Sequence, residues 1–352
     1  MRKKLRVLIV DDSTVIRTLL SRILGSDPDI EVVGTAPDPY IAREMLIDLK
    51  PDAMTLDIDM PKMDGITFLG KVMEHFPTRT LIFSALTQES SAMALKAMDE
   101  GAIDVMSKPD GSKGLTALSA EIISRVKIVA RANLRPVKKS SHQRAPIQTK
   151  AAVNSSSKIV HQVLAIASST GGTTALQEIL PFLPQDLPPT LIVQHMPPVF
   201  TKAYAASLQR ICPFEVKEAE SGDRLEPGRV LLAPGNFHME VYKSGHQYLV
   251  KLHQEALLHG VRPAADYLMK SVAKQFGPNA IGLVLTGMGR DGAEGLLAMK
   301  NAGAFNIAQD EQSCVVFGMP KVAIELGATH KTIALDKIAG EIISHIKIRN
   351  AA

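Results

Sequence analysis

Three polar residues in the second half of the chain each follow an apolar run typical of a buried β-strand. Ser169 comes after Val-Leu-Ala-Ile-Ala-Ser, His195 directly follows Leu-Ile-Val-Gln, and Asp291 lies in a glycine-rich turn after Ile-Gly-Leu-Val-Leu. In an open parallel sheet, the loops at the carboxyl ends of the strands meet at one edge. A hydroxyl, an imidazole and a carboxylate brought together there are the groups that nucleophilic acyl transfer uses. The pattern therefore predicts a Ser-His-Asp site.

Each of these positions has alternatives. Ser169 stands at a strand-to-helix turn, where unpaired backbone N–H groups favour an oxyanion, but Ser168 directly precedes it. His238 also follows a strand-like run and is the second choice for the base. Asp291 is preferred as the carboxylate because it lies in a glycine-rich turn directly after a buried-type strand. The competing carboxylates are Asp223, Asp266 and Asp310.

A second group of polar residues ends the strand-like runs of the first half. Asp11 and Asp12 end the first run, Asp57 the third, Ser84 the fourth and Lys108 the fifth. Clustered carboxylates repel one another unless a cation joins them, and hard oxygen ligands suit Mg²⁺. A carboxylate in such a site can attack a phosphoryl donor. A hydroxyl and an ammonium group are then placed to hydrogen-bond and neutralise the acyl phosphate.

Strand-like and helix-like segments alternate through both halves of the chain. Five such pairs in the first half predict a parallel, doubly wound sheet, and the second half repeats the alternation. Residues 131–158 carry seven Lys or Arg and no Asp or Glu, which is typical of a solvated linker. We therefore predict an α/β protein with two doubly wound parallel-sheet domains, at residues 1–130 and 159–352, joined by a flexible basic linker at 131–158.

Composition excludes several classes of protein. The 352 residues carry a net charge of only +4, include no Trp and are 4% aromatic, which argues against nucleic-acid binding. Neither an apolar run of membrane-spanning length nor a signal peptide is evident, so we expect no membrane insertion. The two cysteines, Cys212 and Cys314, give no disulfide framework or metal-binding spacing. A reducing cytoplasm is the expected location.

Residues 5–128 resemble the receiver domain of two-component response regulators. The matching motifs are Asp-Asp at 11–12, Leu-Asp-Ile-Asp-Met-Pro-Lys-Met-Asp-Gly at 56–65, Phe-Ser-Ala at 83–85 and Ser-Lys-Pro at 107–109. The resemblance implies that Asp57 accepts the phosphoryl group and that Ser84 and Lys108 contact it. It also implies a Mg²⁺ site formed by Asp11, Asp12, Asp57 and the Asp59 carbonyl. The chain departs from the pattern at Val105, where many receivers carry an aromatic residue that reorients on activation.

Residues 159–348 resemble the catalytic domain of the chemotaxis protein-glutamate methylesterases. The matching motifs are Ser-Ser-Thr-Gly-Gly-Thr at 168–173, Gln-His-Met-Pro-Pro at 194–198, Leu-Thr-Gly-Met-Gly-Arg-Asp-Gly-Ala at 285–293 and Cys-Val-Val-Phe-Gly-Met-Pro at 314–320. The resemblance assigns Ser169, which precedes Thr-Gly-Gly, as the nucleophile. The N–H groups of Thr170 and Met288 are the expected oxyanion donors. Arg262 lies in a Val-Arg-Pro stretch where the family has a histidine before the arginine.

Together the two resemblances imply a response regulator with hydrolase activity. Its expected substrates are glutamyl methyl esters on the cytoplasmic helices of chemoreceptors, and receptor glutamines that it deamidates. A sensor histidine kinase is the expected phosphodonor, and the expected place is the cytoplasm, at receptor arrays. The esterase chemistry itself requires no cofactor, and Mg²⁺ belongs to the receiver alone. We also expect phosphorylation to open a catalytic site that the receiver covers. The alternatives are a phosphorylation-dependent binding module with an inert Ser169, and a nucleic-acid regulator, which the missing helix-turn-helix pattern disfavours.

Overall fold

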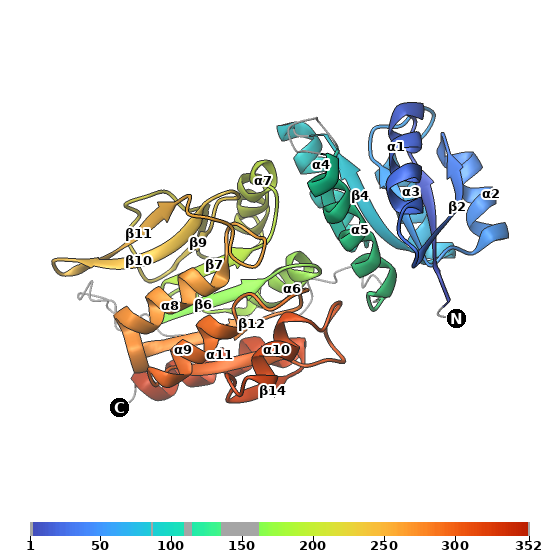
Figure 1. The fold of residues 1–352 in the computed structure, drawn as a ribbon. Helices are drawn as coiled ribbons and strands as arrows, with labels where there is room; N and C mark the ends of the chain where they lie inside the picture. Colours follow the sequence, from blue (N-terminus) through green and yellow to red (C-terminus); the bar gives the residue numbers. More distant parts are fainter. Residues whose placement is uncertain (1–2, 86, 109–114, 135–161, 351–352) are drawn as a thin grey trace. The chain divides into compact units, whose positions relative to one another are not determined.

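The computed structural model describes residues 3–85, 87–108, 115–134 and 162–350. The chain divides into two compact units, Met1–Ser140 and Ser141–Ala352 (Figure 1). Of the predicted linker at 131–158, residues 135–158 lie outside the described part, and residue 131 is the last residue of a helix.

The first unit is a five-stranded parallel sheet with the strand order β2-β1-β3-β4-β5. The predicted parallel, doubly wound sheet is thereby confirmed for this half. Helix α1 contacts α5, whereas α3 contacts both α2 and α4, which separates the helices into two layers (Figure 1). The elements are β1 Leu5–Val10, α1 Thr14–Gly25, β2 Ile30–Ala36, α2 Pro39–Leu49, β3 Ala53–Asp57, α3 Gly65–His75, β4 Arg79–Ser84, α4 Gln88–Asp99, β5 Asp104–Ser107 and α5 Leu115–Arg131.

Short polar side chains begin the helices of this unit. The carboxylate of Asp38 accepts hydrogen bonds from the first-turn amides of α2, and Asp64 does the same for α3. Ser13 caps α1 and Thr87 caps α4. Each cap satisfies amides that have no partner within the helix, so the chain turns sharply from strand end to helix start. These turns keep the strand-end carboxylates at one edge.

The second unit is a seven-stranded parallel sheet with the order β14-β13-β12-β6-β7-β9-β8. An antiparallel hairpin, β10–β11, packs against α8 and was not anticipated from the sequence. The strands are β6 Val163–Ser168, β7 Thr190–Gln194, β8 Glu215–Glu218, β9 Arg229–Leu232, β10 His238–Ser244, β11 Gln247–His253, β12 Ala280–Val284, β13 Phe305–Gln309 and β14 Lys331–Ile333. The α-helices are α6 Gly172–Ile179, α7 Pro198–Gln209, α8 Ala265–Phe276, α9 Ala293–Asn301, α10 Met319–Glu325 and α11 Leu335–Asn350. Short 3₁₀ turns follow α6 and α8, at Leu180–Phe182 and Gly277–Asn279.

The order of the strands in the second unit predicts a crevice at its centre. The chain leaves β6 through α6 to reach β7 on one side, whereas β12 pairs with β6 on the other side. Loops that depart in opposite directions leave a gap above such a point, where ligands bind in open α/β sheets. The second unit therefore offers one preferred position for a site, at the carboxyl ends of β12, β6 and β7.

The start of α3 allows a test of packing in the first unit. A Cβ at Gly65 would overlap the main-chain oxygen of Asp57 and lie 2.9 Å from Ile58 Cα. We expect Gly65→Ala to lower the free energy of unfolding by about 1–3 kcal/mol, because backbone must move. Urea unfolding of the full chain measures this. Gly25→Ala is the matched control, since a Cβ there meets nothing within 4 Å. Equal effects of the two substitutions would contradict the prediction.

Candidate active site

The predicted Ser, His and Asp residues lie beyond the ends of three adjacent strands. Ser169 follows β6, His195 follows β7, and Asp291 lies in the loop between β12 and α9. The His195 N–H donates to Ser168 O at 3.0 Å, which continues the pairing of β6 with β7 past the last strand residues. The structure thus brings residues that are far apart in sequence to adjacent strand ends, where the strand order predicts a crevice.

His195 and Asp291 form a buried hydrogen-bonded pair. His195 Nε2 lies 2.8 Å from Asp291 Oδ2, and only 8% of the His195 surface is exposed. Burial alone would raise the pKa of Asp291, but the hydrogen bond from His195 and two backbone amides hold it below its ordinary value. An ionised carboxylate only accepts hydrogen bonds, so Nε2 carries the proton. Nδ1 of His195 is then the nitrogen that can act as a base.

The backbone around Ser169 is fixed on both sides. Its N–H donates to Thr286 O at 3.1 Å, and its carbonyl accepts from Gly172 N at 2.7 Å. Gly171 has a φ of 77°, and a Cβ there would lie 2.5 Å from Val315 Cβ, so the turn requires glycine. Among the residues that the structure describes, no hydrogen bond joins Ser169 to His195. Catalytic hydrogen bonds are often long without substrate and tighten when it binds.

Gln194 is a functional candidate that the sequence reasoning missed. Its buried side chain accepts from Ser168 Oγ at 2.6 Å and donates to Ser169 O at 2.9 Å and to His195 O at 3.2 Å. It therefore holds the nucleophile loop and the base loop together. The sequence feature that could have identified Gln194 is its position at the end of an apolar run, directly before His195. The Ser168 hydroxyl is fully buried in this bond, which favours Ser169 as the nucleophile.

The alternative bases and acids have other partners. His238 accepts from Ala264 N at 3.1 Å through Nδ1 and donates to Ala256 O at 3.1 Å through Nε2, and burial lowers its pKa. It is therefore a neutral imidazole that holds the loop before α8. Asp223 pairs with Lys217, and Asp310 caps the turn at Ser313. Asp266, by contrast, lies directly beside Asp291.

The proposed oxyanion donors lie in two loops that contact each other. Thr170 is buried, and its carbonyl accepts from Thr286 Oγ1 at 3.0 Å. Met288 follows Gly287, whose N–H is occupied by Val316 O at 3.0 Å. Met288 is 48% exposed. The role of these two amides stays a prediction.

The acidic residues of the first unit also gather at one sheet edge. Asp11 and Asp57 are buried, and Asp12 is exposed beside them. Lys108 Nζ lies 2.6 Å from Asp57 Oδ2 and 3.2 Å from Asp11 Oδ2. Burial raises the pKa of Asp57 to about 6, against the opposing effect of the Lys108 ammonium. The carboxylates in turn raise the pKa of Lys108, although burial acts the other way. This centre has more buried negative charge than its single lysine compensates.

The donor set of this acidic cluster fits a divalent cation. Ligand oxygens of Asp11, Asp12 and Asp57 lie within 4.8 Å of one another. Asp11 Oδ2 and Asp57 Oδ2 are buried and accept no hydrogen bond of good geometry, so their contact is the ion pair with Lys108. Hard oxygen ligands of this kind suit Mg²⁺.

The remaining receiver candidates take these positions. The Asp59 N–H donates to Asp57 Oδ1 at 3.3 Å. The Ser84 hydroxyl, buried at the end of β4, donates to Ser90 O at 3.2 Å. Val105 is buried in β5. Asp59 thus lies at the cluster, whereas Ser84 Oγ turns toward the first turn of α4.

Comparison with known proteins agrees with both resemblances. Residues 164–342 match a family model described as CheB methylesterase, and residues 7–119 match one described as response regulator receiver domain. A protein-glutamate methylesterase/protein-glutamine glutaminase of Bdellovibrio bacteriovorus is 60% identical over 355 residues, covering 100% of each chain. This chain belongs to the CheB methylesterase family. A second such protein, from Syntrophus aciditrophicus, is 46% identical over 97% of this chain and 98% of its own.

A solved structure supports the fold of the second unit of this family member. The catalytic domain of the Thermotoga maritima CheB methylesterase is 40% identical, with a TM-score of 0.51. The likeness covers 52% of this chain and 97% of that domain. The predicted combination of a receiver and a methylesterase domain is confirmed. Within the described ranges, no helix has the length and apolar character needed to cross a membrane.

The Gln194 side chain bonds both Ser169 O and His195 O, and we call this pair of bonds the Gln194 clamp. We expect Gln194→Ala to slow the labelling of Ser169 by a fluorophosphonate probe by about 10- to 100-fold, because small displacements of catalytic loops are costly. Rapid-quench labelling of the full chain measures the rate. Ser168→Ala is the matched control, since it removes the donor to Gln194 Oε1 but leaves the bonds to both loops. If Ser169 were labelled in Gln194→Ala at the same rate as in the wild type, the clamp would be dispensable.

Proposed function

We propose that this chain hydrolyses γ-glutamyl methyl esters on the cytoplasmic helices of chemoreceptors, and that a phosphoryl group on Asp57 activates it. The observation that carries the proposal is the 2.8 Å bond between His195 and Asp291. The two residues follow the strands on either side of β6, the strand that Ser169 follows. Membership of the CheB methylesterase family supports the choice of substrate. The products are methanol and a free glutamate side chain.

The reaction begins with proton transfer from Ser169 Oγ to His195 Nδ1 as the oxygen attacks the ester carbonyl. Asp291 holds the imidazole in the required tautomer and stabilises the imidazolium. The N–H groups of Thr170 and Met288 donate to the oxyanion. The imidazolium then protonates the departing methoxide. Water, deprotonated by His195, then attacks the acyl-enzyme, and the imidazolium returns the proton to Ser169 Oγ as the acyl bond breaks.

A glutamine side chain presents the same carbonyl group to Ser169. In that case the His195 imidazolium protonates the amide nitrogen, which leaves as ammonia, and hydrolysis of the acyl-enzyme again leaves glutamate. The curated relatives from B. bacteriovorus and S. aciditrophicus carry both activities in their names. Deamidation of receptor glutamines therefore belongs to the proposal.

The first unit acts as the switch in this proposal. Asp57 attacks the phosphoryl donor, and Lys108 contacts the new acyl phosphate. Asp11, Asp12, Asp57 and the Asp59 carbonyl would hold Mg²⁺, which would supply positive charge for the transfer of the phosphoryl group. Ser84 rotates from Ser90 O to a phosphoryl oxygen. A sensor histidine kinase supplies the phosphoryl group, and the protein works in the cytoplasm at receptor arrays.

Methanol release tests the esterase reaction. Methylated receptor membranes are incubated with the full chain, a small-molecule phosphodonor and Mg²⁺. We expect Ser169→Ala to lower release by about 10⁴-fold or more, because the nucleophile is lost. Ser168→Ala, the control, retains most of the rate. Equal release by wild type and Ser169→Ala would reject the mechanism, and no release by a phosphorylated wild type would favour a binding module.

Substitutions at the acidic cluster test the switch separately. We expect Asp57→Asn to keep the basal methanol release and to lose its stimulation by the phosphodonor. We expect Asp12→Asn to weaken Mg²⁺ binding, because it removes an exposed carboxylate from the cluster. Mg²⁺-dependent shifts of the thermal unfolding of the full chain measure binding. Stimulation that survives in Asp57→Asn would contradict the assignment of the phosphoacceptor.

A further inference from the structure

Two helices near the triad begin side by side without side-chain caps of their own. Helix α8 is preceded by Ala264 and α9 by Gly292, and neither residue has a side-chain acceptor for the first amides of its helix. Unpaired amides at a buried helix start are costly. Here an aspartate at the start of each helix accepts hydrogen bonds from the first-turn amides of the other helix.

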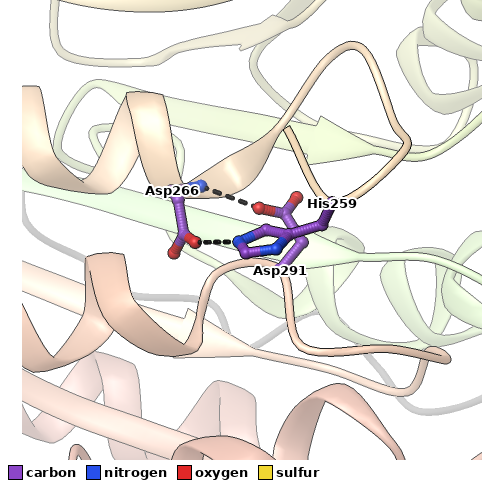
Figure 2. A group of neighbouring side chains, drawn as sticks. All are labelled: His259, Asp266 and Asp291. Carbon is purple, nitrogen blue, oxygen red and sulfur yellow. Dashed lines mark hydrogen bonds and ion pairs between the residues drawn. The ribbon is translucent and has the colours of Figure 1, made fainter. Parts of the chain in front are cut away.

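The exchange joins Asp266, in the first turn of α8, to Asp291, just before α9. Asp291 Oδ2 accepts from Ala265 N at 2.6 Å, and Asp291 Oδ1 accepts from Asp266 N at 3.1 Å. In return, Asp266 Oδ1 accepts from Gly295 N, in the first turn of α9, at 2.6 Å. Figure 2 shows the Asp266 amide directed at the Asp291 carboxylate. Each helix therefore fixes the start of the other.

Close packing leaves this arrangement little freedom. A Cβ at Gly295 would lie 2.6 Å from Met269 Cβ and 3.1 Å from Asp266 Cα. Asp266 is fully buried, and Asp291 is nearly so. A shift of α9 against α8 would move the turn that carries Asp291, and with it the carboxylate that binds His195.

His259 completes the bonding of Asp266. Its Nε2 lies 2.8 Å from Asp266 Oδ2 (Figure 2). The backbone of His259 has a φ of 54°, in the left-handed region that few residues other than glycine adopt, in the loop before α8. Burial raises the pKa of Asp266, and the charge of Asp291 acts in the same direction. A donor from His259 offsets part of that cost.

The bonding pattern argues against a metal ion here, although His259, Asp266 and Asp291 are close enough to bind one. Each of the four carboxylate oxygens already accepts a hydrogen bond. The donors are Gly295 N and His259 for Asp266, and Ala265 N, Asp266 N and His195 for Asp291. The cluster is therefore a hydrogen-bonded support for the triad.

We propose that Asp266 is a positioning residue for the Ser-His-Asp reaction. Through the exchanged helix caps it sets the orientation of the Asp291 carboxylate, and His259 assists by holding Asp266 Oδ2. The effect reaches the substrate only through Asp291 and His195, so it falls on the turnover step rather than on substrate binding. The kinetic part of the test rests on the function proposed above.

The test compares full-length Asp266→Ala, Asp266→Asn and His259→Ala. We expect Asp266→Ala to lower kcat by about 10- to 100-fold with little change in KM, because a displaced catalytic group costs on this scale. Asp266→Asn keeps an oxygen for Gly295 N and retains most of kcat, and His259→Ala falls between the two. Asp223→Ala is the matched control. Asp223 is another partly buried carboxylate, which accepts from Glu220 N and pairs with Lys217 outside the triad network.

Two readouts separate positioning from a general loss of structure. The ring N–H proton of His195, seen by NMR in protein with labelled histidine, reports its bond to Asp291. We expect this signal to shift upfield or exchange faster in Asp266→Ala and to stay unchanged in Asp223→Ala. The rate of fluorophosphonate attack by Ser169 reports the same geometry without a receptor substrate.

The outcomes also separate this inference from the proposed function. Wild type that reacts with the probe but releases no methanol would reject the function, and the probe rates and ring N–H signals of the variants would still decide the inference. The inference would be overturned if Asp266→Ala had the same kcat, the same probe rate and the same ring N–H signal as the wild type. If Asp266→Ala does not fold, His259→Ala decides: an unchanged ring N–H signal and probe rate in that variant would overturn the inference.

Discussion

The catalytic unit depends on how one buried carboxylate is satisfied. An ionised carboxylate removed from water costs several kcal/mol unless strong donors surround it. Asp291 meets this requirement with His195 and the first two amides of α8. The same bonds fix the imidazole, begin a helix and join β7 to the β12 edge of the crevice. Moving any one of these elements leaves a charge without its partners, so the sheet, the helix and the base hold one another in place.

The acidic cluster of the first unit also lies at the carboxyl edge of a parallel sheet, but its charges are balanced differently. Asp57 and Asp11 are buried with one lysine between them, and the pKa of Asp57 is raised to about 6. The two buried carboxylates carry more negative charge than the one lysine compensates, which favours a divalent cation at this centre. The triad, in contrast, has its carboxylate fully bonded and its charge held constant. In the proposed function, the acidic cluster changes its charge when it is phosphorylated, whereas the His195–Asp291 pair keeps its geometry during the reaction.

Several features were predictable from sequence, and particular residues show why others were not. Strand ends are visible as apolar runs, so Ser169, His195 and Asp291 were found as candidates before the order of their strands was known. The clamp at Gln194 was missed because a lone amide residue does not show which carbonyls it will reach. His238 followed a strand as His195 does, but its two ring nitrogens bond backbone groups that only the folded loop supplies. The β10–β11 hairpin was missed because its alternation does not reveal whether a strand joins the main sheet.

The sequence by itself determined the alternation of strands and helices, the two families that the chain resembles and the polar residues at the strand ends. These are local properties, set by side-chain periodicity and by turns that short polar residues and glycine make. Tertiary structure alone decided the strand order that makes β12, β6 and β7 neighbours, and the exchange of caps between α8 and α9. In the sequence, Asp266 was only one of three carboxylates that competed with Asp291. Its contact with Gly295 spans 29 residues of chain, and only the packing of two helices brings the carboxylate to that amide.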